Sequence, residues 1–133
     1  MEQAKTTIPF TVYAFTARKP GMTMEAFKDY YENHHVPYFL KLVDGPKYIS
    51  KYDRSYVQKK EDENVPGVYS GFASDWEYDC IVRVVYRSES AFKEMLKNLE
   101  GVQDKISEDE KNFLNPEKMK VIFVGESPSY DFE

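Results

Sequence analysis

The sequence predicts an α+β domain in which a four-stranded antiparallel sheet carries two helices on one face. Three observations support this prediction: four segments show strand patterns, two show apolar residues at helical spacing, and their order is β-α-β-β-α-β. This order is that of the ferredoxin-like split βαβ unit. A chain of 133 residues fits a single domain, which we expect to span 1–133.

The first half of the chain supplies two strands and one helix. Residues 8–17 form a nearly continuous apolar and β-branched run, which is typical of a buried central strand. Thr23 is a good N-cap for a helix that extends to about residue 42, with Glu25 in its first turn. Residues 47–58 alternate as a strand, with Tyr48, Tyr52, Arg54 and Tyr56 expected on one face.

The second half begins with a long charged and Pro/Gly-rich loop at 59–75. A strong strand follows at 78–88, and Ser88 or Ser90 caps the second helix, which ends before Pro116. The segment "MKVIFVGES" predicts the last strand, and an acidic tail closes the chain at 126–133.

Composition excludes several classes of protein. A net charge of −5 argues against nucleic-acid binding, and no run of 18 apolar residues exists that could span a membrane. The start of the chain lacks the features of a secretory signal, and the single cysteine, Cys80, fits a reducing compartment, so we expect a cytoplasmic protein. Aromatic residues make up 16%, which suits a pocket for a flat oxygenated ligand, a subunit interface or an aromatic core.

One face of the predicted sheet has no helix to cover it. The predicted strands are too apolar to leave that face in water. A second copy packed sheet to sheet would bury it, so we expect a homodimer.

The only histidines, His34 and His35, precede Pro37. Adjacent helical residues point about 100° apart, and no further histidine completes a ligand set, so we expect no metal site. Pro37 lacks an N–H and disfavours α conformation at Val36, so the helix should kink or end near His35. His35 lies one turn after Tyr31 on the same side of the helix. Helix capping and a functional role for His35 both remain open on this evidence.

The stretch "KPGMTMEAFKDYYENHHVPYFLKL" resembles the opening signature of the EthD-type dimeric α/β-barrel family. Its aromatic-x-x-x-His-x-Pro pattern falls on Tyr31, His35 and Pro37. A second similarity lies in "WEYDCIVRVVYRSESAF", and the resemblance covers about residues 10–125. It implies a dimeric ferredoxin-like fold with a pocket between helices and sheet. It also implies enzymes that act on aromatic polyketides without metal or organic cofactor, including decarboxylases of anthrone-type acids.

From this resemblance we expect a cofactor-free lyase of secondary metabolism, most simply a decarboxylase. His35 would be the general acid or base, Tyr31 a donor to a developing oxyanion, and Asp79 an orienter of the imidazole. Candidate substrate-binding residues are Tyr52, Arg54, His34, Trp76 and Tyr48. Arg54 is equally compatible with a surface charge, and Trp76 with an anchor of the loop.

Two other classes of function remain open. A cofactor-free monooxygenase, dehydratase or cyclase on a similar polyketide would use the same scaffold. A haem protein with His35 as axial ligand, or a ligand-binding barrel, is the other.

Overall fold

The computed structural model of the protein describes residues 8–60 and 64–132. Its sheet consists of β1 (Phe10–Thr16), β2 (Ile49–Tyr56), β3 (Cys80–Tyr86) and β4 (Lys120–Val124). The strand order is β2-β3-β1-β4, and all neighbouring strands are antiparallel. The predicted four-stranded antiparallel sheet is therefore confirmed.

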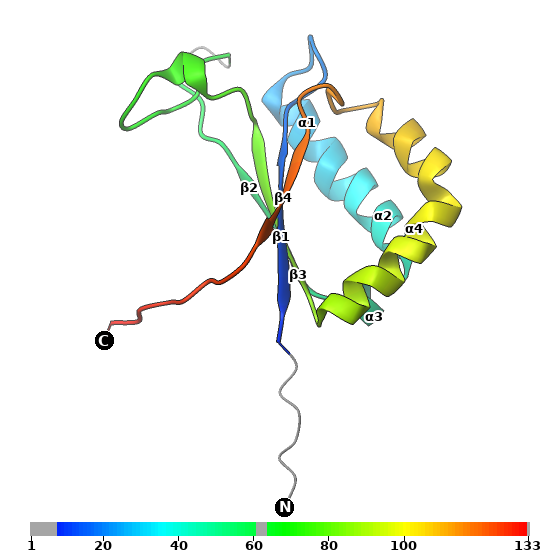
Figure 1. Ribbon diagram of the computed structural model, residues 1–133. Helices are drawn as coiled ribbons and strands as arrows, with labels where there is room; N and C mark the ends of the chain where they lie inside the picture. Colours follow the sequence, from blue (N-terminus) through cyan, green and yellow to red (C-terminus); the bar gives the residue numbers. More distant parts are fainter. Residues whose placement is uncertain (1–7, 61–63, 133) are drawn as a thin grey trace, which may run out of the picture.

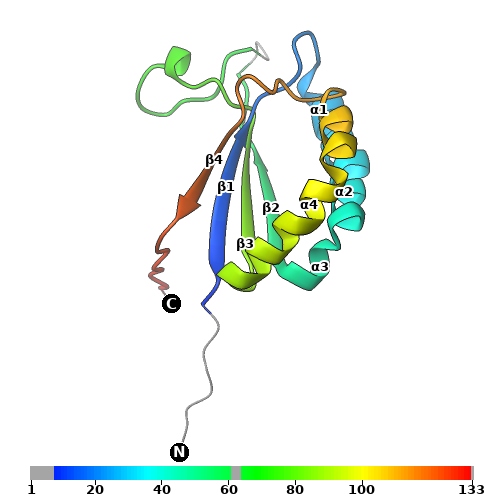
Figure 2. The same ribbon diagram turned by 45° about the vertical axis from the view of Figure 1, so that its right-hand side comes forward.

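The main helices all cover one face of this sheet (Figures 1 and 2). They are α1 (Met24–Tyr30), a five-residue π turn η1 (Tyr31–His35), α2 (Val36–Val43), α3 (Gly45–Tyr48) and α4 (Glu89–Glu110). A short 3-10 turn, η2 (Ala73–Asp75), lies in the loop between β2 and β3. The α+β class and the helices-on-one-face arrangement agree with the sequence prediction.

Side-chain caps define where the two long helical segments begin. The hydroxyl of Thr23 accepts a hydrogen bond from the N–H of Ala26 at 3.1 Å. Ser88, rather than Ser90, caps α4, because its hydroxyl accepts from the N–H of Ala91 at 3.0 Å. α4 then continues unbroken for 22 residues.

The helix around Pro37 differs from our expectation in one respect. Val36 keeps α conformation, with φ −58° and ψ −52°, so the prediction that it leaves the α region is wrong. The chain instead widens into the π turn η1, in which the N–H of Val36 bonds to the carbonyl of Tyr31. Pro37 then lies in the first turn of α2, a position at which proline is tolerated.

The core lies between the helices and the sheet. Its most deeply buried side chains include Phe27, Phe113, Met95 and Val43. Phe27 contacts the rings of Tyr31, Tyr56 and Phe113, with centroids 5.5–6.1 Å apart. This aromatic layer packs directly against the candidate site described below.

None of the described α-helices covers the opposite face of the sheet (Figures 1 and 2). The strand register places apolar and polar side chains on it: Thr11, Tyr13, Phe15, Lys51, Asp53, Ser55, Ile81, Arg83, Val85, Lys120, Ile122 and Val124. The β2–β3 loop and the C-terminal segment both extend toward this side. We call this surface the open face.

The connection between β2 and β3 contains the loop expected at 59–75, of which residues 61–63 lie outside the described part of the chain. An isolated bridge pairs Lys59 with Pro66 and gives the described part of the loop a hairpin-like base. Residue 133 of the expected tail likewise lies outside the described residues.

Candidate active site

His35 is the last residue of the π turn and is buried, with 5% of its surface exposed. Aromatic rings surround it: the centroids of Phe113, Tyr31 and Phe39 lie 4.8, 5.4 and 5.9 Å from that of the imidazole. Water is thereby largely excluded from the ring, and any polar contact it makes is strengthened by the low local dielectric constant.

Within residues 8–60 and 64–132, the imidazole has one polar partner. Nδ1 of His35 lies 2.7 Å from Oδ2 of Asp109, near the end of α4. Because a carboxylate can only accept, Nδ1 carries the proton, and in the neutral ring Nε2 carries the lone pair. Nε2 has no hydrogen-bond partner among the described residues. This leaves one ring nitrogen available for chemistry.

Burial sets the charge state of this ring. Desolvation lowers the pKa of His35 below its ordinary value of 6.5, and the hydrogen bond and charge of Asp109 oppose that effect only in part. His35 is therefore neutral at pH 7. A neutral imidazole with a free lone pair is a general base.

Asp109 is itself held by a second donor. The Tyr30 hydroxyl donates to Oδ1 of Asp109 at 2.6 Å, and Nδ2 of Asn112 donates to the Tyr30 oxygen at 2.9 Å. Burial, followed by the hydrogen bond to Asp109, raises the pKa of Tyr30, so its hydroxyl stays protonated and keeps donating. The four side chains His35, Asp109, Tyr30 and Asn112 form one hydrogen-bonded chain, which we call the His35 network.

An open hollow of about 600 Å³ adjoins this network between the first helical stretch and α4. Its lining includes Tyr30, Asp109 and Asn112, and His35 is not among the lining residues. His34 lines the same hollow, is exposed, and stacks on Tyr30 with ring centroids 5.0 Å apart. The two neighbouring histidines therefore lie on different sides of the helix, one buried and one at the surface.

Two of the expected substrate-binding residues lie on the helix-facing side of β2. Tyr52 contacts Phe39, whose ring also packs on His35, and the guanidinium of Arg54 lies 5.0 Å from the Tyr52 ring. The structure thus brings Tyr31, His35, Tyr52 and Arg54 into one neighbourhood beneath the sheet.

Arg54 is not free to bind a substrate oxygen in this arrangement. Its Nε and Nη2 donate to the two carboxylate oxygens of Glu32 at 2.8 and 2.6 Å. The Tyr56 hydroxyl adds a third donor to Glu32 at 2.5 Å. The bidentate pair compensates the charge of Arg54 and raises its pKa further, while it lowers the pKa of Glu32.

The buried Tyr31 and the half-buried Tyr52 supply neutral donors near His35. Burial raises the pKa of Tyr31 well above its ordinary value and raises that of Tyr52 as well. Both hydroxyls therefore remain protonated throughout the physiological range. They can donate to an oxygen that gains charge during a reaction, but they cannot act as bases there.

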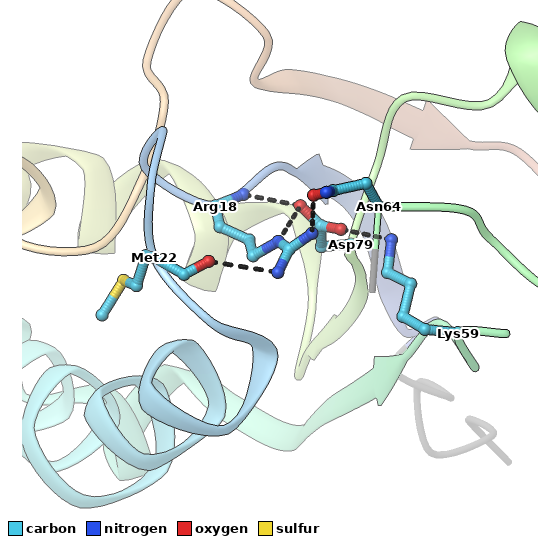
Figure 3. Close-up of polar contacts among 5 residues, drawn as sticks. All are labelled: Arg18, Met22, Lys59, Asn64 and Asp79. Atoms are coloured by element: carbon cyan, nitrogen blue, oxygen red, sulfur yellow. Dashed lines mark hydrogen bonds and ion pairs between the residues drawn. The ribbon is translucent and has the colours of Figure 1, made fainter. Parts of the chain in front are cut away.

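Asp79 does not orient the imidazole; it contacts Arg18 and Lys59 instead (Figure 3). Its Oδ2 accepts from the backbone N–H of Arg18 at 2.8 Å and lies 3.5 Å from Nε of Arg18, and its Oδ1 lies 2.5 Å from Nζ of Lys59. The guanidinium of Arg18 also donates to the carbonyl of Met22 and to Asn64. Asp79 thus connects the β2–β3 loop to the turn before α1. The carboxylate that contacts the imidazole, a role we had expected for Asp79, belongs to Asp109.

Trp76 and Tyr48 also lie away from His35. Trp76 packs edge-on against Phe15 and Tyr78, and Phe15 belongs to the open face, so the tryptophan anchors the loop to the far side of the sheet. Tyr48 ends α3 and is buried, and its hydroxyl lies 3.4 Å from Nδ2 of Asn98 on α4. The expectation that it shares a strand face with Tyr52 is wrong, because the strand begins only at Ile49 and its register shifts before Lys51.

Sequence reasoning missed Asp109 and Tyr30. Asp109 stands in the run "SEDEKN", in which the sequence does not show which of the three acidic residues faces the core and which face solvent. Tyr30 is one of 11 tyrosines. Only the packing of α4 against η1 brings Asp109 to His35. No local pattern could have selected it.

No group of three or more metal-ligating side chains is found among residues 8–60 and 64–132. Within the same described ranges, no helix has the length and apolar character needed to cross a bilayer.

Comparison with known proteins identifies a relative and two similar folds. The chain is 28% identical over 79 residues to the dehydratase ustZ of Ustilaginoidea virens, a match that spans 59% of this chain and 56% of that protein. The fold resembles an EthD-like protein from Ralstonia eutropha JMP134, with a TM-score of 0.56, 11% identity and 90% of both chains covered. A hypothetical Arabidopsis thaliana protein gives a TM-score of 0.52 at 17% identity, with 98% of this chain and 96% of that chain covered.

The chain spans just over half the length of the curated relative, and the two structures support the fold alone. The family is shown by a separate match: residues 19–117, which include the π turn, His35 and Asp109, fit the EthD domain. The protein belongs to the EthD domain family.

Proposed function

We propose that the protein is a cofactor-free lyase that removes water from a hydroxylated, anthrone-type aromatic polyketide. The observation that carries this proposal is the buried His35–Asp109 pair, in which Nδ1 is occupied and Nε2 has no partner among the described residues. The similarity to a dehydratase supports the same class of reaction.

The proposed reaction uses His35 as a proton carrier. Nε2 takes a proton from the ring carbon next to the carbonyl group, and the electrons move onto the carbonyl oxygen. The hydroxyl of Tyr31 or Tyr52 donates to that oxygen as its charge grows. The enolate then expels the hydroxyl group on the next carbon of the same ring, which leaves as water with the proton returned by the imidazolium. The carbonyl group is restored, and the resulting ring enone tautomerises to the aromatic phenol.

Access to Nε2 involves Phe39. Its ring lies between His35 and Tyr52, with centroids 5.9 Å from each. A hollow of about 160 Å³ on the outer side of Tyr52 is lined by Leu40, Pro46 and Ile49, among others. In this proposal the substrate enters from that hollow, and rotation of the half-buried Phe39 side chain opens the path.

Decarboxylation is the second candidate. The aromatic enclosure of His35 favours it, because transfer of a carboxylate into a water-poor site weakens its solvation and assists loss of CO₂. That reaction requires a proton donor to carbon, however, and the lowered pKa of His35 leaves the ring without the second proton at pH 7. Dehydration therefore fits the charge state of the site better.

One experiment separates the candidates. Purified protein is incubated with matched pairs of hydroxylated anthrone-type ketones and anthrone-type carboxylic acids, and the products are identified by mass spectrometry. Loss of water from the ketones supports the proposal, and loss of CO₂ from the acids supports the second candidate. Consumption of O₂ with quinone formation would contradict both, as would an absorption spectrum with a Soret band.

The proposal includes a homodimer formed through the open face. Ile122 on this face is 48% exposed, and the register places it beside Tyr13. The β2–β3 loop and the C-terminal segment extend on the same side and would contact a second copy at the edges of the interface (Figures 1 and 2). A two-fold axis that lies between the two sheets, parallel to their planes, brings the same face of each copy into contact, as isologous dimers require.

A further inference from the structure

A carboxylate on Nδ1 has two opposing effects on a histidine base. It fixes the tautomer that leaves Nε2 unprotonated, but it also stabilises the imidazolium form. A strong pair would keep the ring protonated at neutral pH and leave Nε2 without a lone pair. A histidine that works as a base beside a carboxylate therefore needs a feature that limits how strongly the carboxylate stabilises the imidazolium form.

Tyr30 supplies such a feature. Its hydroxyl donates to Oδ1 of Asp109 at 2.6 Å, while His35 occupies Oδ2 at 2.7 Å. Two donors thus share one carboxylate, so part of its negative charge is directed to the Tyr30 hydroxyl and its attraction for the His35 N–H is reduced. The positive end of the hydroxyl dipole also points toward Asp109 and opposes a positive charge on the nearby imidazole.

The position of Tyr30 is fixed from several sides. Asn112 donates to the Tyr30 oxygen at 2.9 Å, which polarises the hydroxyl and strengthens its donation to Asp109. The ring packs between His34 and Phe113, each with a centroid 5.0 Å away. The contact between Tyr30 and Asp109 is therefore part of a built network rather than a chance approach of two surface groups.

We propose that Tyr30 is a positioning residue of the active site, which acts through Asp109 to limit the hold of that carboxylate on His35 and so keeps Nε2 available as a base. The inference rests on the proposed role of His35 as the base. Tyr31 was the tyrosine expected to assist His35. It touches the imidazole edge-on from the π turn, whereas Tyr30 reaches the ring only through the carboxylate.

The other titratable groups around the pair come from four elements. They are Tyr31 and His34 on η1, Tyr38 on α2, Tyr52 on β2 beyond Phe39, and Asp104, Lys105, Glu108 and Glu110 on α4. Burial and the charge of Asp109 raise the pKa of Glu110 to about 6, so Glu110 titrates in the same range as a histidine. A test must therefore report on the His35 ring itself rather than on activity alone.

Proton NMR titration of the two histidines provides this report, with His34→Gln to identify the His35 signal. In Tyr30→Phe, which keeps the ring and its packing, the His35 midpoint should rise by about half a pH unit to one unit, the size expected for one lost hydrogen bond. In Asp109→Asn it should fall. Tyr38→Phe is the matched control, because it removes a hydroxyl from the same hollow and should leave the midpoint unchanged.

An unchanged or lowered midpoint in Tyr30→Phe overturns the inference, and so does an equal rise in Tyr38→Phe. Asn112→Ala gives an independent variant, for which a smaller rise is expected and no rise counts against the inference. The titration requires no substrate. If the midpoints shift as expected while His35→Gln retains full turnover, the proposed function fails and the effect of Tyr30 on His35 stands.

Discussion

Nδ1 of His35 and Oδ2 of Asp109 lie 2.7 Å apart, although 74 positions separate the two residues along the chain. One comes from a π turn that Pro37 imposes on the first helix, and the other from near the end of α4. The proton chemistry proposed for this protein depends on that contact.

Removal of the Asp109 charge should slow turnover without loss of the fold. A hydrogen bond to a charged group contributes enough that Asp109→Asn should lower kcat/KM by about 10- to 100-fold. The acid limb of the pH profile should also move to lower pH, because the pKa of His35 falls when its anionic partner is removed. Asp104→Asn is the control, since Asp104 lines the same hollow on the same helix. Equal effects of the two changes would contradict the assignment.

Glu110 should make the stability of the fold depend on pH. Its pKa is raised to about 6 by burial and by Asp109, so the folded state favours the protonated form, and the stability that this provides is lost as pH rises from about 4.5 through 6. Glu110→Gln should therefore raise the melting temperature above pH 6 and leave it nearly unchanged below pH 4.5. The exposed Glu108→Gln serves as control. A stabilisation that is independent of pH would contradict this prediction.

Asp79 should matter for stability and not for chemistry. Its side chain is only 10% exposed and faces both Arg18 and Lys59. Asp79→Asn removes the carboxylate charge that faces the two cations, and we expect a loss of about 3 kcal/mol in the free energy of unfolding, measured by urea denaturation. The kcat of the folded fraction should be unchanged, and the exposed Asp75→Asn should alter neither quantity. A normal free energy of unfolding together with a large fall in kcat would contradict this prediction and indicate a catalytic role for Asp79.

The sequence predicted the fold better than it predicted the site. Strand patterns, caps at Thr23 and Ser88, and the break near Pro37 are local features that the residues themselves dictate. The π turn was harder to predict, because a helix can accommodate the missing N–H of Pro37 either by a kink or by a wider turn. The contact between Asp109 and Tyr30 forms only when helices distant in sequence pack together. Tyr48 does not lie on the strand face expected for it, because the register shifts at the start of β2.

The open face should mediate a homodimer. Light scattering on the purified protein should give the mass of two chains, and Ile122→Asp should give that of one, because a charge buried in a sheet-to-sheet interface is left without a partner. Val121→Asp is the matched control, since Val121 is 56% exposed on the same strand but points to the other face. A single-chain mass for the wild-type protein would contradict the proposed dimer.

The most direct test of the account is the turnover of His35→Gln on the ketone that the wild-type protein dehydrates. Glutamine can still meet Asp109 but cannot carry a proton, so water release should fall by about 10²–10⁴-fold while the far-UV circular dichroism spectrum stays the same. Dehydration at the wild-type rate in this variant would contradict the assignment of His35 as the base.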